Sequence, residues 1–174
     1  AQALGYAEAD PSMDVGGGDA AHKLWILALL GFGAHVPLDD VSVEGIEAIE
    51  AVDHELAERF GYCIKHLVIG RDHGDTVELR VHPAMIDRRG VLANVSGVLN
   101  AVLIEGDGLG PCLVSGRGAG DLPTAVSVVS DLVDVARAHV AGVAGLSTRG
   151  IRFSERRLMP LGRVRTRYYV RFAV

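Results

Sequence analysis

Two β-rich runs joined by a short polar turn dominate the middle of the chain. They lie in the stretch YCIKHLVIGRDHGDTVELRVHPAMI, where Asp72–Asp75 separates one run from the other. Such runs on either side of glycine and polar residues are typical of a β-hairpin. Because the strands of a hairpin run antiparallel, this stretch restricts the chain to folds that contain an antiparallel sheet.

Helical patterns and a second strand pair complete the predicted fold. Helices are predicted from Asp19 to about Phe32, over AVDHELAERFG up to Gly61, and over DLPTAVSVVSDLVDVARAH. Asp19 is the expected N-cap of the first helix, and Gly31 and Gly33 are its expected stop. A second pair of strands is predicted around the turn EGDGLG. The sequence therefore predicts an α+β domain with a mostly antiparallel open sheet covered on one face by helices.

Composition excludes several classes of protein. The chain has 174 residues, of which 49% are hydrophobic, enough for the core of one ordinary domain. A net charge of −5 argues against a nucleic-acid surface. The unbroken apolar part of the most hydrophobic window, Leu24–Leu30, is far shorter than the roughly 20 residues of a membrane span.

The start of the chain carries no export signal, because acidic residues and Pro11 stand where such a signal would be basic and then apolar. We therefore expect a cytoplasmic protein without a membrane or nucleic-acid partner. In that compartment Cys63 and Cys112, which both lie in apolar runs, are expected to be buried free thiols.

Both ends of the chain suggest a fragment of a longer protein. The sequence opens without Met and closes on the strand-like run RTRYYVRFAV. Glycines, basic residues and Pro160 in residues 141–163 are typical of a linker. We expect one domain over residues 1–140, a linker over 141–163 and the start of another domain over 164–174.

The opening stretch YAEADPSMDVGGGDAAHKL places four carboxylates before one amine, that of Lys23. It does not fit a calcium loop, because counting from Asp10 puts Val15 where the invariant glycine would be and Ala21 where the glutamate would be. No pair among the seven histidines has the i, i+4 spacing of a zinc site. We predict no metal.

Acid–base chemistry is the remaining possibility for this stretch. Asp19 and Lys23 are four residues apart, hence on one face of the first helical turn. An amine there feels the positive end of the helix dipole, which favours its neutral form and lets it exchange protons. The pattern alone favours an ordinary surface ion pair preceded by a solvated acidic loop.

A second glycine-rich stretch, SGRGAGDLPTA, stands between a predicted strand and a predicted helix. Its backbone amides could approach a phosphate or a nicotinamide ribose. It is not the dinucleotide fingerprint, because Asp121 occupies the place of the last glycine. The alternative is a tight turn with Asp121 as the N-cap.

These two stretches together resemble motifs of homoserine dehydrogenase. The resemblance is carried by GYAEADPSMDVGGGDAAHKL, VHPAMI, LANVSGVLNAV, EGDGLG and SGRGAGDLPTAVSVVSDLVDVAR. They occur in order and cover the chain from residue 1 to about 140. The family interconverts L-homoserine and L-aspartate 4-semialdehyde with NAD or NADP in threonine, methionine and isoleucine biosynthesis. Its members combine an N-terminal Rossmann domain with a catalytic domain that also dimerises, and many end in a regulatory ACT domain.

The resemblance implies roles for six residues. Lys23 matches the acid–base lysine, and Glu8 and Asp19 match residues that bind or orient homoserine. Tyr6 and Asp14 match further substrate-pocket positions, and Gly120 matches a contact of the cofactor. We expect Glu8, Asp19 and Lys23 to converge on one cleft. Gly18 departs from the family pattern, which has a bulky apolar residue there.

The resemblance also implies what the chain lacks. It contains no nucleotide-binding domain, which would bind most of the NAD or NADP, and RTRYYVRFAV resembles the first strand of a truncated ACT domain. The sequence thus predicts the catalytic part of a dimeric or larger homo-oligomeric enzyme, inactive by itself. The alternative is a non-enzymatic amino-acid-binding or oligomerisation module of the same fold.

Overall fold

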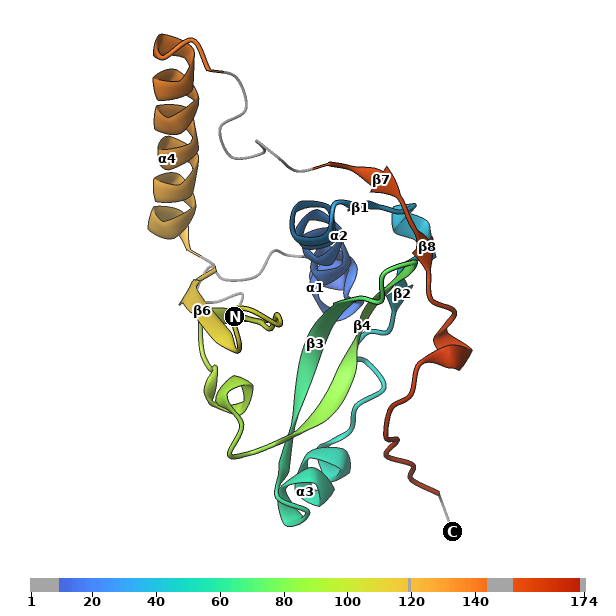
Figure 1. The fold of residues 1–174 in the computed structure, drawn as a ribbon. Coiled ribbons are helices and arrows are strands. Elements are labelled where there is room, and N and C mark those ends of the chain that lie inside the picture. Colours follow the sequence, from blue (N-terminus) through green and yellow to red (C-terminus); the bar gives the residue numbers. More distant parts are fainter. Residues whose placement is uncertain (1–9, 119, 144–151, 173–174) are drawn as a thin grey trace. The chain divides into compact units, whose positions relative to one another are not determined.

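The computed structural model describes residues 10–118, 120–143 and 152–172. The chain divides into two compact units, coloured along the sequence in Figure 1. The sheet unit consists of Pro11–Asp87 and the described part of Gly150–Val174. The α4 unit consists of Arg88–Arg149 and Ala1–Asp10, again in their described parts. The two units are described separately below.

A long hairpin is the centre of the sheet unit, as the sequence predicts (Figure 1). Strand β3 (Tyr62–Asp72) pairs antiparallel with strand β4 (Thr76–Asp87) over the full length of β3. The turn between them closes through a hydrogen bond from the His73 N–H to the Thr76 carbonyl. Gly74 has a φ of 82°, a left-handed conformation that a glycine adopts at little cost.

Four two-residue strands add parallel pairings to the sheet unit. Strands β2 (Ser42–Val43) and β8 (Arg157–Leu158) both pair parallel with β4. Strand β1 (Ala34–His35) pairs parallel with β7 (Ser154–Glu155) in a sheet of its own. Because these pairings are parallel, the predicted mostly antiparallel sheet is confirmed only in part.

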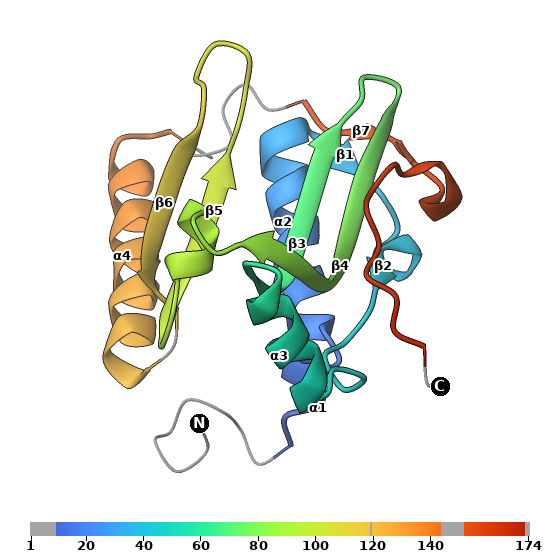
Figure 2. The same ribbon diagram turned by 90° about the horizontal axis from the view of Figure 1, so that it is seen from below.

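Helix α2 (Gly18–Phe32) covers one face of the hairpin and forms the core with it (Figure 2). Its buried Leu24 and Ala28 belong to one apolar cluster with Val77, Leu79 and Val81 of β4. Those three valine and leucine positions alternate along β4, so they share one face of the strand.

Both ends of α2 are set by glycines in left-handed conformations. The helix ends at Gly33, with a φ of 62°, as predicted, whereas Gly31 lies inside the helix. Its N-cap is Gly17, with a φ of 85°, and Asp19 lies in the first turn. The prediction of Asp19 as N-cap was wrong, because the chain turns into the helix through a backbone conformation that disfavours any residue with a side chain.

The remaining helices of the sheet unit are short. They are α1 (Ser12–Val15), α3 (Ala51–Arg59) and the 3-10 turns η2 (Leu38–Asp40) and η5 (Leu161–Arg163). A capping box begins α3, in which the Glu50 and Asp53 side chains each accept a hydrogen bond from the other's backbone N–H. The chain leaves α3 at Phe60 and Gly61, which confirms the predicted end of this helix.

The α4 unit contains the second predicted strand pair and the long helix. Its elements are η3 (Val91–Asn94), β5 (Leu99–Ile104), β6 (Cys112–Arg117) and α4 (Asp121–Val140). Strands β5 and β6 pair antiparallel. The N-cap of α4 is Gly120, and Asp121 is the first helical residue instead of the predicted cap. None of the residues of α4 is buried.

The segment expected to be a linker returns in part to the sheet unit. Within residues 141–163, β7 and β8 pair with β1 and β4 as given above. Between them, the Arg156 guanidinium donates a hydrogen bond of 2.6 Å to Asp72 and another to the Gly74 carbonyl. Residues 164–172, expected to form a strand, contain none. The division into domains stays a prediction.

Two further observations concern the described residues. No helix among them is long and apolar enough to cross a membrane. Cys63 and Cys112 are free and partly buried.

Candidate functional site

Lys23 and Asp19 form an ion pair on the first turns of α2, where the Lys23 ammonium donates a hydrogen bond to the Asp19 carboxylate. Their side chains are 60% and 45% exposed. An ion pair this exposed contributes at most about 1 kcal/mol to stability. The fold therefore does not depend on the pair, and its amine remains accessible to another molecule.

The other predicted substrate residues lie upstream of this pair. Asp14 is exposed on α1, which is joined to α2 by Gly16 and Gly17. Tyr6 and Glu8 lie outside the described residues. The structure thus brings Asp19 and Lys23 together, and the predicted convergence with Glu8 stays a prediction.

Gly120, the predicted cofactor contact, begins α4 in the other unit. Its φ of 122° and ψ of 151° lie in a region that is essentially restricted to glycine. Nearby Gly118 packs so closely that an added Cβ would lie 1.8 Å from Asn100 Nδ2. The first N–H groups of a helix have no acceptor within the helix, and such groups can bind an anionic group. The cofactor contact of Gly120 stays a prediction.

A buried charged network on β4 was missed by sequence reasoning. The Arg80 Nε donates a hydrogen bond of 2.7 Å to Glu78, and both residues are buried. His73 Nε2 lies 3.2 Å from the other Glu78 oxygen, and Arg80 also contacts His82. The alternation of apolar and polar residues in VELRVH could have indicated this network. Residues 78, 80 and 82 share one face of the strand, and the apolar residues occupy the other.

The charge state of Glu78 follows from this network. Burial alone would raise the pKa of its carboxyl, since a charge is costly away from water. Hydrogen bonds from Arg80 and His73 and the positive charge of Arg80 outweigh burial and lower that pKa below its ordinary value. Glu78 is thus ionised at neutral pH and forms a permanent ion pair with Arg80.

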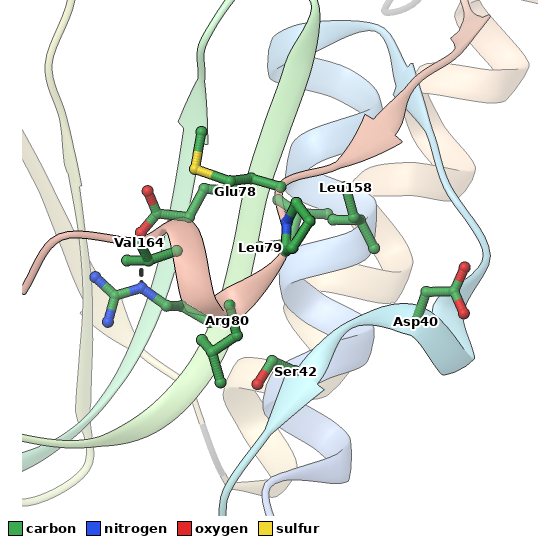
Figure 3. A pocket seen from close by; sticks show the side chains of 10 residues that line it. Asp40, Ser42, Glu78, Leu79, Arg80, Leu158 and Val164 are labelled. Carbon is green, nitrogen blue, oxygen red and sulfur yellow. Dashed lines mark hydrogen bonds and ion pairs between the residues drawn. The ribbon is translucent and has the colours of Figure 1, made fainter.

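This ion pair lines a cavity of about 160 Å³ in the sheet unit (Figure 3). Glu78 and Arg80 stand on one side of the cavity and Asp40 on the other. The cavity is smaller than the roughly 300–1,000 Å³ of sites that enclose drug-sized ligands. None of the predicted site residues lines it, so it is separate from the Lys23–Asp19 pair.

A second unpredicted cluster joins the C-terminal segment to the start of α3. The Tyr169 hydroxyl donates a hydrogen bond of 2.8 Å to Asp53, and Arg171 Nε lies 3.1 Å from the same carboxylate oxygen. Arg171 also pairs with Glu50 at 2.7 Å. We call these four residues the C-terminal clasp. No local pattern could have found it, because Asp53 and Tyr169 are 116 positions apart.

Among the residues that the structure describes, no group of three or more His, Cys, Asp or Glu side chains is placed to hold a metal ion.

Comparison with known proteins identifies the family. The family model described as "Homoserine dehydrogenase" matches residues 1–133. The chain belongs to the homoserine dehydrogenase family. The homoserine dehydrogenase of Helicobacter pylori is 45% identical over 174 residues, which is 100% of this chain and 40% of that protein. The chain thus spans about 40% of the length of this curated relative.

Solved homoserine dehydrogenases share the fold. The enzyme from Thiobacillus denitrificans matches with a TM-score of 0.86 at 46% identity, over 94% of this chain and 39% of that one. A hyperthermophilic archaeal homoserine dehydrogenase in complex with NADPH matches with a TM-score of 0.59 at 26% identity, over 76% of this chain and 36% of that one. The α+β fold predicted from the sequence is therefore confirmed as that of the family.

Proposed function

We propose that the chain is the substrate-binding and catalytic part of an enzyme that interconverts L-homoserine and L-aspartate 4-semialdehyde with NAD or NADP. The observation that carries the proposal is the accessible Lys23–Asp19 pair at the start of α2, in a chain whose family match covers residues 1–133. The chain supplies about 40% of its relatives' length, so the proposal concerns the full-length protein that contains it.

Proton transfer is the role proposed for Lys23. Oxidation of homoserine removes a hydride from the carbinol carbon and a proton from its hydroxyl, and bound NAD or NADP would supply the hydride acceptor. A Lys23 amine in its neutral form takes the hydroxyl proton, and in the reverse direction the ammonium returns it to the aldehyde oxygen. Asp19 accepts a hydrogen bond from Lys23 and so holds the amine in place.

Recognition of the substrate and cofactor is assigned to the remaining residues. The carboxylate of Glu8 is the proposed partner of the homoserine ammonium group, with Tyr6 and Asp14 completing the pocket. Gly120 is proposed to contact NAD or NADP, which its glycine-restricted backbone before α4 supports. We also propose a homodimer or larger homo-oligomer, which the exposed apolar side chains of β5, β6 and α4 support.

The test is Lys23→Ala in the full-length enzyme, assayed in both directions. Turnover should fall by about 100-fold or more, the scale expected when a positioned acid–base group is removed. Cofactor affinity and the melting temperature should stay close to wild type, because the ion pair is exposed. Lys65→Ala, which removes the amine of the other lysine, on β3, is the control. Normal turnover of Lys23→Ala would refute the assignment of proton transfer to this lysine.

A further inference from the structure

The connection between α1 and α2 is a tight elbow made of Gly16 and Gly17. Gly17 is buried and has a φ of 85°. An added Cβ there would lie 3.0 Å from His66 Cε1 and 3.0 Å from Val43 Cγ1. The backbone conformation therefore favours glycine, and any side chain there would crowd the His66 ring and Val43.

The turn after β2 packs against the end of α1 and the elbow. The Ile46 N–H donates a hydrogen bond of 2.9 Å to the Val15 carbonyl at the end of α1. Gly45 packs so closely that an added Cβ would lie 2.6 Å from the Val15 oxygen and 3.0 Å from the Gly16 Cα. The turn thus holds the end of α1 by one hydrogen bond and one backbone-to-backbone contact.

His66 connects this turn to the central hairpin. It lies on β3, opposite Pro83 of β4, and its Nε2 is 2.9 Å from the Glu44 carbonyl oxygen. A carbonyl can only accept, so Nε2 carries the proton in this contact. The Glu44 N–H in turn donates to the Val81 carbonyl of β4 at 2.8 Å. One imidazole therefore lies beside the elbow glycine and hydrogen-bonds to the turn that holds α1.

We propose that His66 is a positioning residue of the reaction, which sets the angle at which α1 meets α2. Asp14 lies on α1, whereas Asp19 and Lys23 lie on the first turns of α2, immediately after Gly17. A change at Gly17 therefore moves the lysine relative to Asp14. Displacement of a reacting group by about 1 Å can cost about 100-fold in rate. This inference rests on the role proposed above for Lys23.

Two properties of His66 are used, its volume against Gly17 and its hydrogen bond to Glu44. Alanine removes both. Glutamine keeps a side-chain N–H donor at a similar reach, and so restores the hydrogen bond. Leucine keeps apolar volume but cannot donate. The three variants separate the positioning hydrogen bond from packing alone.

The experiment uses the full-length enzyme with His66→Ala, His66→Gln and His66→Leu, and His54→Ala on α3 as the control for loss of an exposed histidine. We expect His66→Ala and His66→Leu to lower kcat about tenfold, with the KM for the cofactor unchanged, and His66→Gln to recover most of the loss. Wild-type kcat in His66→Ala, or equal losses in His66→Gln and His66→Leu, would overturn the proposal.

A double-mutant cycle with Lys23→Ala shows whether His66 acts through the lysine. If it does, His66→Ala should cost less than about twofold in kcat once Lys23 has been removed, because the two losses are not additive. A further tenfold loss in that background would contradict the positioning role. If Lys23→Ala retained turnover, the proposed function would fail, whereas a normal His66→Ala beside an inactive Lys23→Ala would refute only the positioning role.

Discussion

The two units differ in how they use their apolar residues. All the buried hydrophobic side chains among the described residues lie in the sheet unit, between Ala21 and Val81. The α4 unit is also rich in leucine and valine, but they are exposed along β5, β6 and α4. One unit has a core of its own, whereas the apolar surface of the other is available for a partner.

The two long helices show the contrast most directly. Helix α2 buries Leu24, Ala21 and Ala28 against the hairpin, and α4 buries no residue. Apolar residues in a sequence therefore predict burial, but they do not show which surface covers them. For α2 the covering surface belongs to the same unit. For α4, the homo-oligomer proposed above would supply it.

The largest effect expected from this comparison is that of a matched pair of leucine substitutions. Leu24→Ala on α2, where the side chain is 3% exposed, should lower the free energy of unfolding by about 2–5 kcal/mol through loss of burial and the cavity left behind. Leu132→Ala on α4, where it is 63% exposed, should change it by about 0.5 kcal/mol or less. Urea denaturation of the 174-residue chain measures both, and equal losses would remove the distinction between the units.

An intermediate effect is expected on assembly. In the full-length enzyme, Leu132→Glu introduces a charge on the apolar surface of α4 and should raise the dissociation constant of the oligomer about tenfold or more, equivalent to about 1.4 kcal/mol. Asp134→Ala, two residues further along the helix, is the control. Analytical ultracentrifugation over a range of concentrations gives the constants. An unchanged constant for Leu132→Glu would mean that α4 takes no part in the interface.

The smallest effect concerns the C-terminal clasp and its dependence on pH. The pKa of the Asp53 carboxyl is lowered chiefly by the hydrogen bond from the Glu50 N–H, and then by the hydrogen bond from Tyr169. Because its pKa is lower when folded than when unfolded, the stability it contributes is complete above about pH 4 and is lost as the pH falls through the folded value. Tyr169→Phe should therefore raise this pKa and weaken the acid dependence.

Carboxyl titration by NMR checks this last expectation. The pKa of Asp53 should lie below 3.8 in the wild type and move toward that value in Tyr169→Phe. Tyr168→Phe, at the neighbouring and more exposed tyrosine, is the control. An identical Asp53 pKa in wild type and Tyr169→Phe would show that the clasp is not closed in solution.

Regular elements could be predicted from the sequence because their causes are local. Both hairpins follow from β-rich runs around polar, glycine-containing turns, and the three longest helices follow from helical patterns. The ends of α2 and α3 follow from Gly33 and Gly61. The N-caps could not be predicted in the same way. Gly17 precedes α2 in a left-handed conformation, next to the side chains of His66 and Val43, and that environment depends on the folded sheet.

The candidate site was predictable only where its residues are neighbours in sequence. The i, i+4 spacing was enough to predict the contact of Asp19 with Lys23. The family resemblance supplied the roles of Glu8, Tyr6 and Gly120, which no spacing rule gives. Contacts between distant segments, such as His66 with the elbow, have no counterpart in local patterns.

The pairing of β8 with β4 has a consequence for the order in which a ribosome makes this protein. Strand β4 is complete at Asp87, but the residues that pair with Thr76 and Val77 are Arg157 and Leu158. At about 5–20 residues per second, several seconds of synthesis separate the two. During that time the nascent chain exposes an unpaired strand edge, which is a template for association with other chains. We therefore expect this edge to be open to association with other chains while residues 88–156 are being translated.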